Sequence, residues 1–204
     1  MGLSFDLDRA QKEFLGRQAI YAIESVLAGD GDAKPLLPGP ECAESGNGLP
    51  LSRDLGAFVT LTENGRLRGC IGTIIAHEPL YLNVWNMARQ AAFSDPRFPA
   101  LKADEWPAVT MEISVLDQPA KCPDPAAIVI GRDGLILSCQ GRTGVFLPQV
   151  PVEQGWNLDQ YLNHLCLKAG VPQGSWRKPG AELFWYQALV FPVARRQAAE
   201  KGNG

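Results

Sequence analysis

Residues 56–74 read GAFVTLTENGRLRGCIGTI, and this stretch predicts two antiparallel strands joined by a tight turn. Both runs are rich in β-branched and apolar residues, which favour strands. Between them, Asn64-Gly65 is typical of a two-residue hairpin loop, because both positions of that loop need a positive φ. The sequence therefore predicts a β-hairpin whose second strand carries LRGCIGT, residues 67–73.

Outward from this hairpin, the chain alternates helical and strand-like segments. Apolar residues at helical spacing predict helices at 7–28, 78–93 and 157–170, started by Asp6 or Asp8, by Pro79 and by Asn157. Apolar runs predict strands at 108–117 and 182–193, and Asp133-Gly134 predicts a second hairpin within 127–139. Strands outnumber helices and come mainly as hairpins, so we expect an α+β fold with a largely antiparallel sheet and flanking helices.

Charge and cysteine content narrow the class of protein. The net charge of −3 and the pI of about 5.4 argue against a general nucleic-acid binder, which normally carries a basic surface. The chain has five cysteines at irregular spacing, no C-x-x-C pair, no signal-peptide pattern and no long apolar run. These features predict a cytoplasmic protein with free thiols and no membrane span.

Cys70 is the first candidate for chemistry. Side chains alternate along a strand, so Arg68 and Cys70 are expected to point the same way, with Gly69 and Gly72 leaving space beside the sulfur. A nearby guanidinium favours the thiolate, the reactive form of cysteine. The alternative is structural, because unpaired cysteine often packs as a small hydrophobic residue. The residues alone leave both readings open.

Other candidates lie outside the hairpin. His77 follows the second strand and could fold back toward its end as a base for Cys70. In SDPRFP, Asp95 and Arg97 form either a rigid salt-bridged turn or a turn that presents Arg97 to the same cleft as Cys70. Arg142, between two glycines in GRTG, is either part of a plain turn or an anion ligand. No metal-ligand spacing is present, so neither a metal nor another cofactor is predicted.

The motifs LRGCIGT, GAFVTL, FSDPRFP, GVFLPQVPVEQGW and YLNHLCLKAG, in this order, resemble the AMMECR domain family, also called AmmeMemoRadiSam system protein A. The resemblance covers roughly residues 5–193, which are expected to form one AMMECR-like domain. The segment 29–54, with five glycines and four prolines, is expected to be a loop within it, either a mobile surface loop or a lid. Residues 194–204 are expected to be a frayed tail.

The resemblance implies two closely joined subdomains that form a cleft near the cysteine motif. It also implies partners, because relatives are often encoded with, or fused to, a Memo-like protein and a radical SAM protein. Gln149 and Glu153 stand in a family-like segment and are expected to line the cleft with Arg97 and Arg142. The family does not specify a reaction.

The predicted function is therefore an enzyme, or a component of an enzyme system, that binds a small anionic ligand or a partner's polypeptide. Cys70 would be the thiolate, with Arg68 and His77 beside it, and Arg97, Arg142, Gln149 and Glu153 would bind the substrate. The alternative is a non-catalytic interaction module that docks with Memo-like or radical SAM partners. A weaker alternative is a sequence-specific nucleic-acid-binding regulator.

Overall fold

The structure is a computed structural model, and it describes residues 3–42 and 50–194. The chain divides into two compact units. Among the described residues, the larger unit consists of Phe5–Val115 and residues 190–194, and the smaller unit consists of Leu116–Leu189 and residues 3–4. The predicted α+β class is confirmed, since four helices accompany an antiparallel sheet in the described part of the chain.

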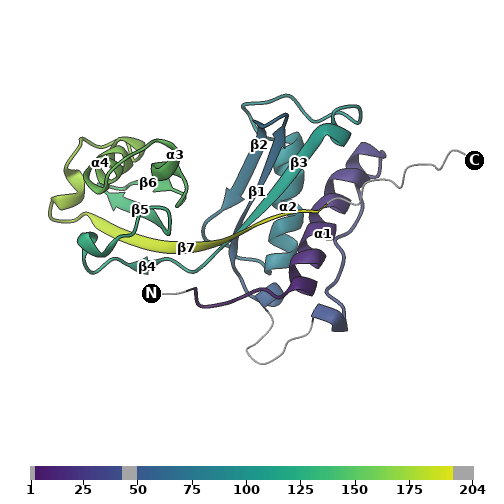
Figure 1. The fold of residues 1–204 in the computed structure, drawn as a ribbon, viewed down its shortest axis with the longest axis horizontal. Coiled ribbons are helices and arrows are strands. Elements are labelled where there is room, and N and C mark those ends of the chain that lie inside the picture. The colour runs from purple at the N-terminus through teal and green to yellow at the C-terminus, as the bar shows by residue number, and fades with distance from the viewer. Residues whose placement is uncertain (1–2, 43–49, 195–204) are drawn as a thin grey trace, which may run out of the picture. The chain divides into compact units, whose positions relative to one another are not determined.

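In the larger unit, helices α1 (Arg9–Leu27) and α2 (Leu80–Phe93) pack side by side on one face of strands β1 (Gly56–Glu63), β2 (Arg66–Thr73) and β3 (Val109–Leu116) (Figure 1). The strand order is β2-β1-β3, followed by the end of β7 (Glu182–Pro192), so β2 lies at an edge. Asp8 begins α1 with a capping box, as one of the two predicted caps. Pro79 precedes α2 as its N-cap rather than being its first residue.

The first hairpin is confirmed. Strands β1 and β2 pair antiparallel from Ala57–Thr73 to Glu63–Arg66, and Asn64 and Gly65 both have positive φ, at 50° and 75°. Alternate residues of β1 are fully buried toward the helices, whereas those between them are half-buried. The face of the strands away from the helices is therefore the one whose side chains are accessible from solvent.

The smaller unit contains β4 (Ala120–Lys121), β5 (Asp133–Cys139), β6 (Arg142–Phe146), α3 (Val150–Glu153), α4 (Leu158–Lys168) and most of β7. Its strand order is β7-β5-β6, and β4 pairs with β7. The core packs α4 against β5. Asn157 caps α4, as predicted.

The second predicted hairpin is wrong. Asp133 and Gly134 begin strand β5 instead of forming a turn, because the Asp133 carboxylate accepts hydrogen bonds from Val129 and Arg132 and closes a compact loop before the strand. The true turn is Gln140-Gly141, where φ is 54° and 71°, and it joins β5 to β6.

The glycine- and proline-rich segment 29–54 contains two short 3-10 turns, Pro40–Cys42 and Pro50–Ser52. The side-chain amide of Gln18 accepts from the Leu36 backbone N–H at 2.9 Å and donates to the Leu36 carbonyl at 3.2 Å. Residues 43–49 lie outside the described residues, so the choice between surface loop and lid stays open. Of the predicted tail 194–204, residues 195–204 also lie outside them.

Candidate functional site

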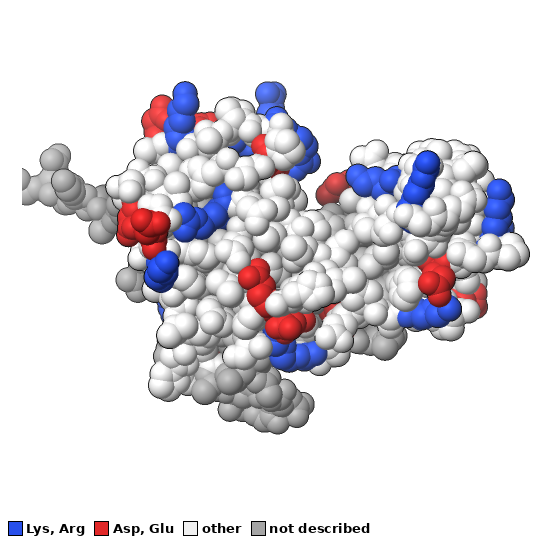
Figure 2. Space-filling view, turned by 180° about the vertical axis from the view of Figure 1, so that it is seen from behind, with Lys and Arg blue, Asp and Glu red and all other residues white. Residues whose placement is uncertain are grey.

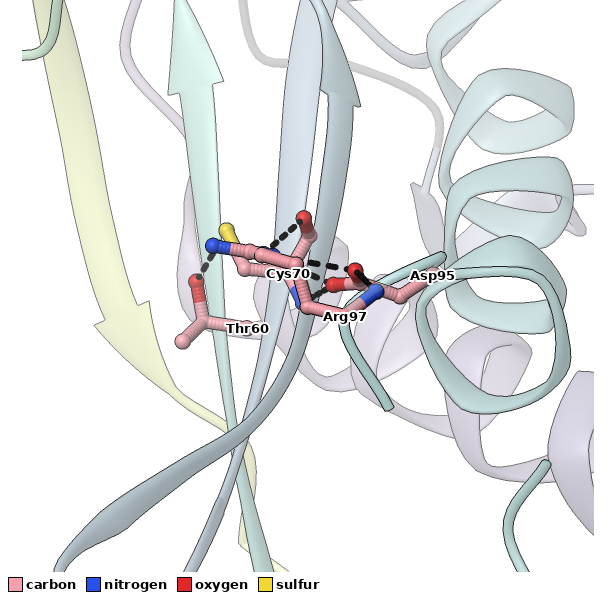
Figure 3. A network of polar contacts seen from close by, with 4 residues as sticks. All are labelled: Thr60, Cys70, Asp95 and Arg97. Carbon is pink, nitrogen blue, oxygen red and sulfur yellow. Dashed lines mark hydrogen bonds and ion pairs between the residues drawn. The ribbon is translucent and has the colours of Figure 1, made fainter. Parts of the chain in front are cut away.

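Cys70 lies on the edge strand β2, opposite Thr60 of β1. The Thr60 hydroxyl donates a hydrogen bond to Cys70 Sγ over 3.3 Å. Both side chains project from the sheet on the side away from helix α2 (Figure 3). Cys70 is half-buried, and the remaining cysteines are buried: Cys42, Cys122, Cys139 and Cys166. Cys70 is therefore the cysteine that a reagent can reach most readily.

The outer edge of β2 is closed at Cys70 by Asp95 and Arg97, which follow helix α2. The Cys70 N–H donates to Asp95 Oδ2 at 2.9 Å, and Arg97 Nη2 donates to the Cys70 carbonyl at 3.1 Å. These two side chains thus replace the main-chain partners that a further strand would supply, which protects the edge from pairing with another chain. Figure 3 shows the Arg97 side chain crossing the strand beside the sulfur.

Asp95 and Arg97 form a bidentate ion pair. Arg97 Nε donates to Asp95 Oδ1 at 3.0 Å, and Nη2 donates to Oδ2 at 2.7 Å. The Asp95 side chain is 2% exposed, whereas the Arg97 side chain is 53% exposed. Hydrogen bonds from Arg97 hold the pKa of Asp95 far below its usual range, against the effect of burial. The pKa of Arg97 is raised mainly by its hydrogen bond with Asp95 and, to a smaller extent, by the neighbouring Cys70 side chain.

Arg68 does not follow the predicted alternation. Leu61 pairs with Gly69 and Thr62 with Leu67, so Arg68 is the extra residue of a β-bulge. Arg68 is 7% exposed, and its Nε and Nη2 donate to the Glu105 carboxylate at 3.0 and 3.1 Å. The hydrogen bond from Arg68 lowers the pKa of Glu105. The guanidinium recorded beside Cys70 is accordingly that of Arg97.

The two glycines of the motif allow close packing within the protein. A Cβ on Gly69 would lie 2.1 Å from the Ala91 carbonyl oxygen of α2, and one on Gly72 would lie 2.2 Å from the Phe58 ring. Gly69 therefore lets the helix approach the strand, and Gly72 makes room for an aromatic side chain. The space expected beside the sulfur is used by protein atoms at these two positions.

The other predicted site residues are placed as follows. His77 is exposed in the turn before α2 and has no recorded hydrogen bond to another described residue. Arg142, Gln149 and Glu153 belong to the smaller unit. Arg142 Nη1 donates to the Gly170 carbonyl after α4, and Gln149 and Glu153 lie at the two ends of α3. The catalytic and substrate-binding roles assigned to these residues, and to Arg68 and Cys70, stay predictions.

Sequence reasoning named Cys70 and Arg97 but missed Thr60 as a neighbour of the sulfur. The pairing of Thr60 with Cys70 follows from the two-residue loop at Asn64-Gly65 only after the bulge at Arg68 is known. The salt-bridged turn predicted for SDPRFP is present, and Arg97 also donates to the Cys70 carbonyl; its presentation to a cleft stays a prediction.

Three further observations concern metal ions, membrane spans and surface charge. The described residues hold no group of three or more His, Cys, Asp or Glu side chains placed to bind a metal ion. None of the helices described here is both long and apolar enough to cross a membrane. On the face shown in Figure 2, Lys and Arg are scattered among Asp and Glu and form no continuous basic surface.

The fold and this site define an α+β protein with a half-buried cysteine on an edge strand, whose main chain is held by a buried aspartate and its half-exposed arginine partner. A family model described as AMMECR1 matches residues 18–191, and the chain belongs to this family. A protein from Methanococcoides burtonii is 43% identical over 91% of this chain and 90% of its own length. Protein MK0488 of Methanopyrus kandleri is 40% identical over 93% and 95%.

A solved structure has the same fold. The crystal structure of the uncharacterized protein PH0010 from Pyrococcus horikoshii superposes with a TM-score of 0.79 at 34% identity, covering 92% of this chain and 94% of that one. The resemblance inferred from the motifs is thereby confirmed at the level of family and fold.

Proposed function

We propose that this chain is an enzyme, or a component of an enzyme system, in which Cys70 is the reactive thiolate. The observation that carries the proposal is the set of contacts around the sulfur. Thr60 donates a hydrogen bond to Sγ, and the Arg97 guanidinium lies beside it, held by the buried Asp95. A hydroxyl donor and a positive charge both favour the negatively charged thiolate.

The partial exposure of the Arg97 side chain also supports binding of a small anionic ligand near Cys70. The Arg97 side chain is 53% exposed, while Asp95 fixes the position of its guanidinium. In the proposed system the chain acts with a Memo-like and a radical SAM protein, and the family resemblance is what supports these partners. A cytoplasmic location fits the proposal, because none of the five cysteines is in a disulfide and a reducing compartment keeps thiols free.

The experiment is alkylation of the purified protein by iodoacetamide, with each cysteine followed by peptide mass spectrometry. Cys70 is expected to react first, and Arg97→Gln to slow its alkylation several-fold. Arg66→Gln is the matched control, since Arg66 is an exposed arginine of the same strand. Two results would count against a reactive thiolate. In the first, Cys70 is alkylated as slowly as the buried cysteines; in the second, its alkylation rate is the same in Arg97→Gln and Arg66→Gln.

A second candidate is a non-catalytic interaction module. Two apolar side chains near Cys70 favour it, because Leu67 is 44% exposed and Ile75 is 64% exposed. Cys70→Ser separates the two candidates. If binding to the purified partners and the cellular phenotype survive this substitution unchanged, the interaction module is the better description.

A nucleic-acid-binding regulator would be recognised differently. Its affinity for nucleic acid would depend steeply on salt concentration.

A further inference from the structure

The guanidinium of Arg97 is held in one orientation beside the sulfur. Its Nε and Nη2 atoms are bound to the Asp95 carboxylate, and Nη2 also donates to the Cys70 carbonyl. Asp95 is in turn fixed by the Cys70 N–H. The outer end of the guanidinium therefore stays next to the thiol, where Figure 3 shows it, and the exposed half of the side chain leaves access from solvent.

A second donor lies near the same atom. The Thr60 hydroxyl is 3.3 Å from Cys70 Sγ and can turn toward an oxygen bound next to the sulfur. A fixed cation and a hydroxyl beside a nucleophile are the groups that stabilise an oxygen on which negative charge develops. Such an oxygen forms when a thiolate attacks a carbonyl group.

We propose that Cys70 accepts an acyl group from an activated ester or thioester; this inference rests on the proposed function. The sulfur attacks the carbonyl carbon, a C–S bond forms, and the carbonyl π electrons move onto the oxygen beside Arg97 and Thr60. When the C=O bond re-forms, the bond to the leaving alcohol or thiol breaks, and that group takes a proton from water. The acyl group stays on Cys70 as a thioester.

The groups around Cys70 fit disulfide exchange less well than they fit acyl transfer. In that reaction the negative charge appears on the leaving sulfur and no oxyanion forms, so Arg97 and Thr60 would act on the attacking thiolate alone. A second thiol is also needed to resolve the mixed disulfide, and the four other cysteines of the chain are buried. The surroundings of Cys70 therefore favour acyl transfer.

The test compares two reagents on the full chain. 4-Nitrophenyl acetate reports acylation through release of nitrophenolate, and iodoacetamide reports thiolate reactivity without an oxyanion. We expect a burst of one nitrophenolate per chain and a single acetyl group on the Cys70 peptide, both absent in Cys70→Ser. Arg97→Gln should lower the acylation rate about tenfold more than the alkylation rate, and Thr60→Val should act in the same direction. Arg66→Gln should change neither.

The Cys70 peptide is followed with both reagents, and a loss of folded protein is recognised by labelling of the four buried cysteines. An equal fall in both rates for Arg97→Gln overturns the acyl proposal, since Arg97 would then act on the thiolate alone. Rapid alkylation without acylation also overturns it, while the reactive thiolate stands. A Cys70 that reacts with neither reagent overturns the proposed function itself.

Discussion

Asp95→Ala is the substitution that most directly tests how the site is held together. The Asp95 carboxylate accepts hydrogen bonds from the Cys70 N–H at 2.9 Å, from the Arg97 N–H at 3.1 Å, and from Arg97 Nε and Nη2 at 3.0 and 2.7 Å. Alanine removes all of these contacts at once. We expect the folded state to lose stability and the Cys70 edge of β2 to loosen.

The magnitude follows from the burial of each partner. A hydrogen bond to a charged group contributes about 1.5–3 kcal/mol, so a simple sum over these bonds would be far too large. Removing the carboxylate also removes the cost of burying its charge, which offsets part of the loss. The Arg97 side chain is already half exposed and can be hydrated again, as can an N–H at a sheet edge. We therefore expect a net loss of about 3 kcal/mol.

Thermal unfolding followed by circular dichroism measures this loss. For a chain of this size, 1 kcal/mol shifts the Tm by about 2–4 °C, so Asp95→Ala is expected to lower it by about 6–12 °C. Asp104→Ala is the matched control, because Asp104 is exposed in a turn and has no recorded side-chain contact with the described residues. A Tm for Asp95→Ala that equals that of Asp104→Ala would refute the reasoning.

The remaining predictions concern the larger unit, which contains Asp95, and the turn at Gln140-Gly141 in the smaller unit. Gly69→Ala should cost about 1–3 kcal/mol in urea unfolding, because its Cβ meets the main chain of α2. Gly72→Ala should also destabilise the fold, because its Cβ would meet the Phe58 ring at Cγ and the Ala57 main-chain carbonyl; a neutral Gly72→Ala would contradict the packing described. Because the pKa of Asp95 is lowered on folding, its contribution to stability is fully present above about pH 4 and declines progressively as the pH falls from there toward the lowered pKa. The Tm values of the wild type and Asp95→Ala should then converge on acidification, and a constant gap would argue against that contribution. Gln140→Asn should stabilise the chain by up to about 1 kcal/mol in the same urea assay, because asparagine tolerates the positive φ there better than glutamine; a loss of stability would speak against a two-residue turn at this position.

The elements that could be predicted from the sequence are those set by local rules. The periodic apolar residues of α1, α2 and α4 and the caps at Asp8 and Asn157 are properties of short stretches. Asn64-Gly65 specifies a hairpin loop by its backbone preference alone. Cys70 and Arg97 were recognised as candidates for a site from their motifs before any contact between them was known.

Other features depended on atoms far apart in the chain. Asp133-Gly134 has the composition of a turn, but the hydrogen bonds of the Asp133 carboxylate to the preceding loop and the pairing with β7 make it the start of a strand. Gln140 carries no turn signal, and its positive φ comes from the register of β5 with β6.

The sequence by itself determined the fold class, the first hairpin and the position of the candidate cysteine, because these depend on residues close together in the chain. Only the tertiary structure decided which arginine lies beside the sulfur. A single bulge at Arg68 changes the direction of its side chain, so that Arg68 binds Glu105 while Arg97 reaches Cys70. A bulge depends on packing against neighbouring elements, and period-two alternation cannot reveal it.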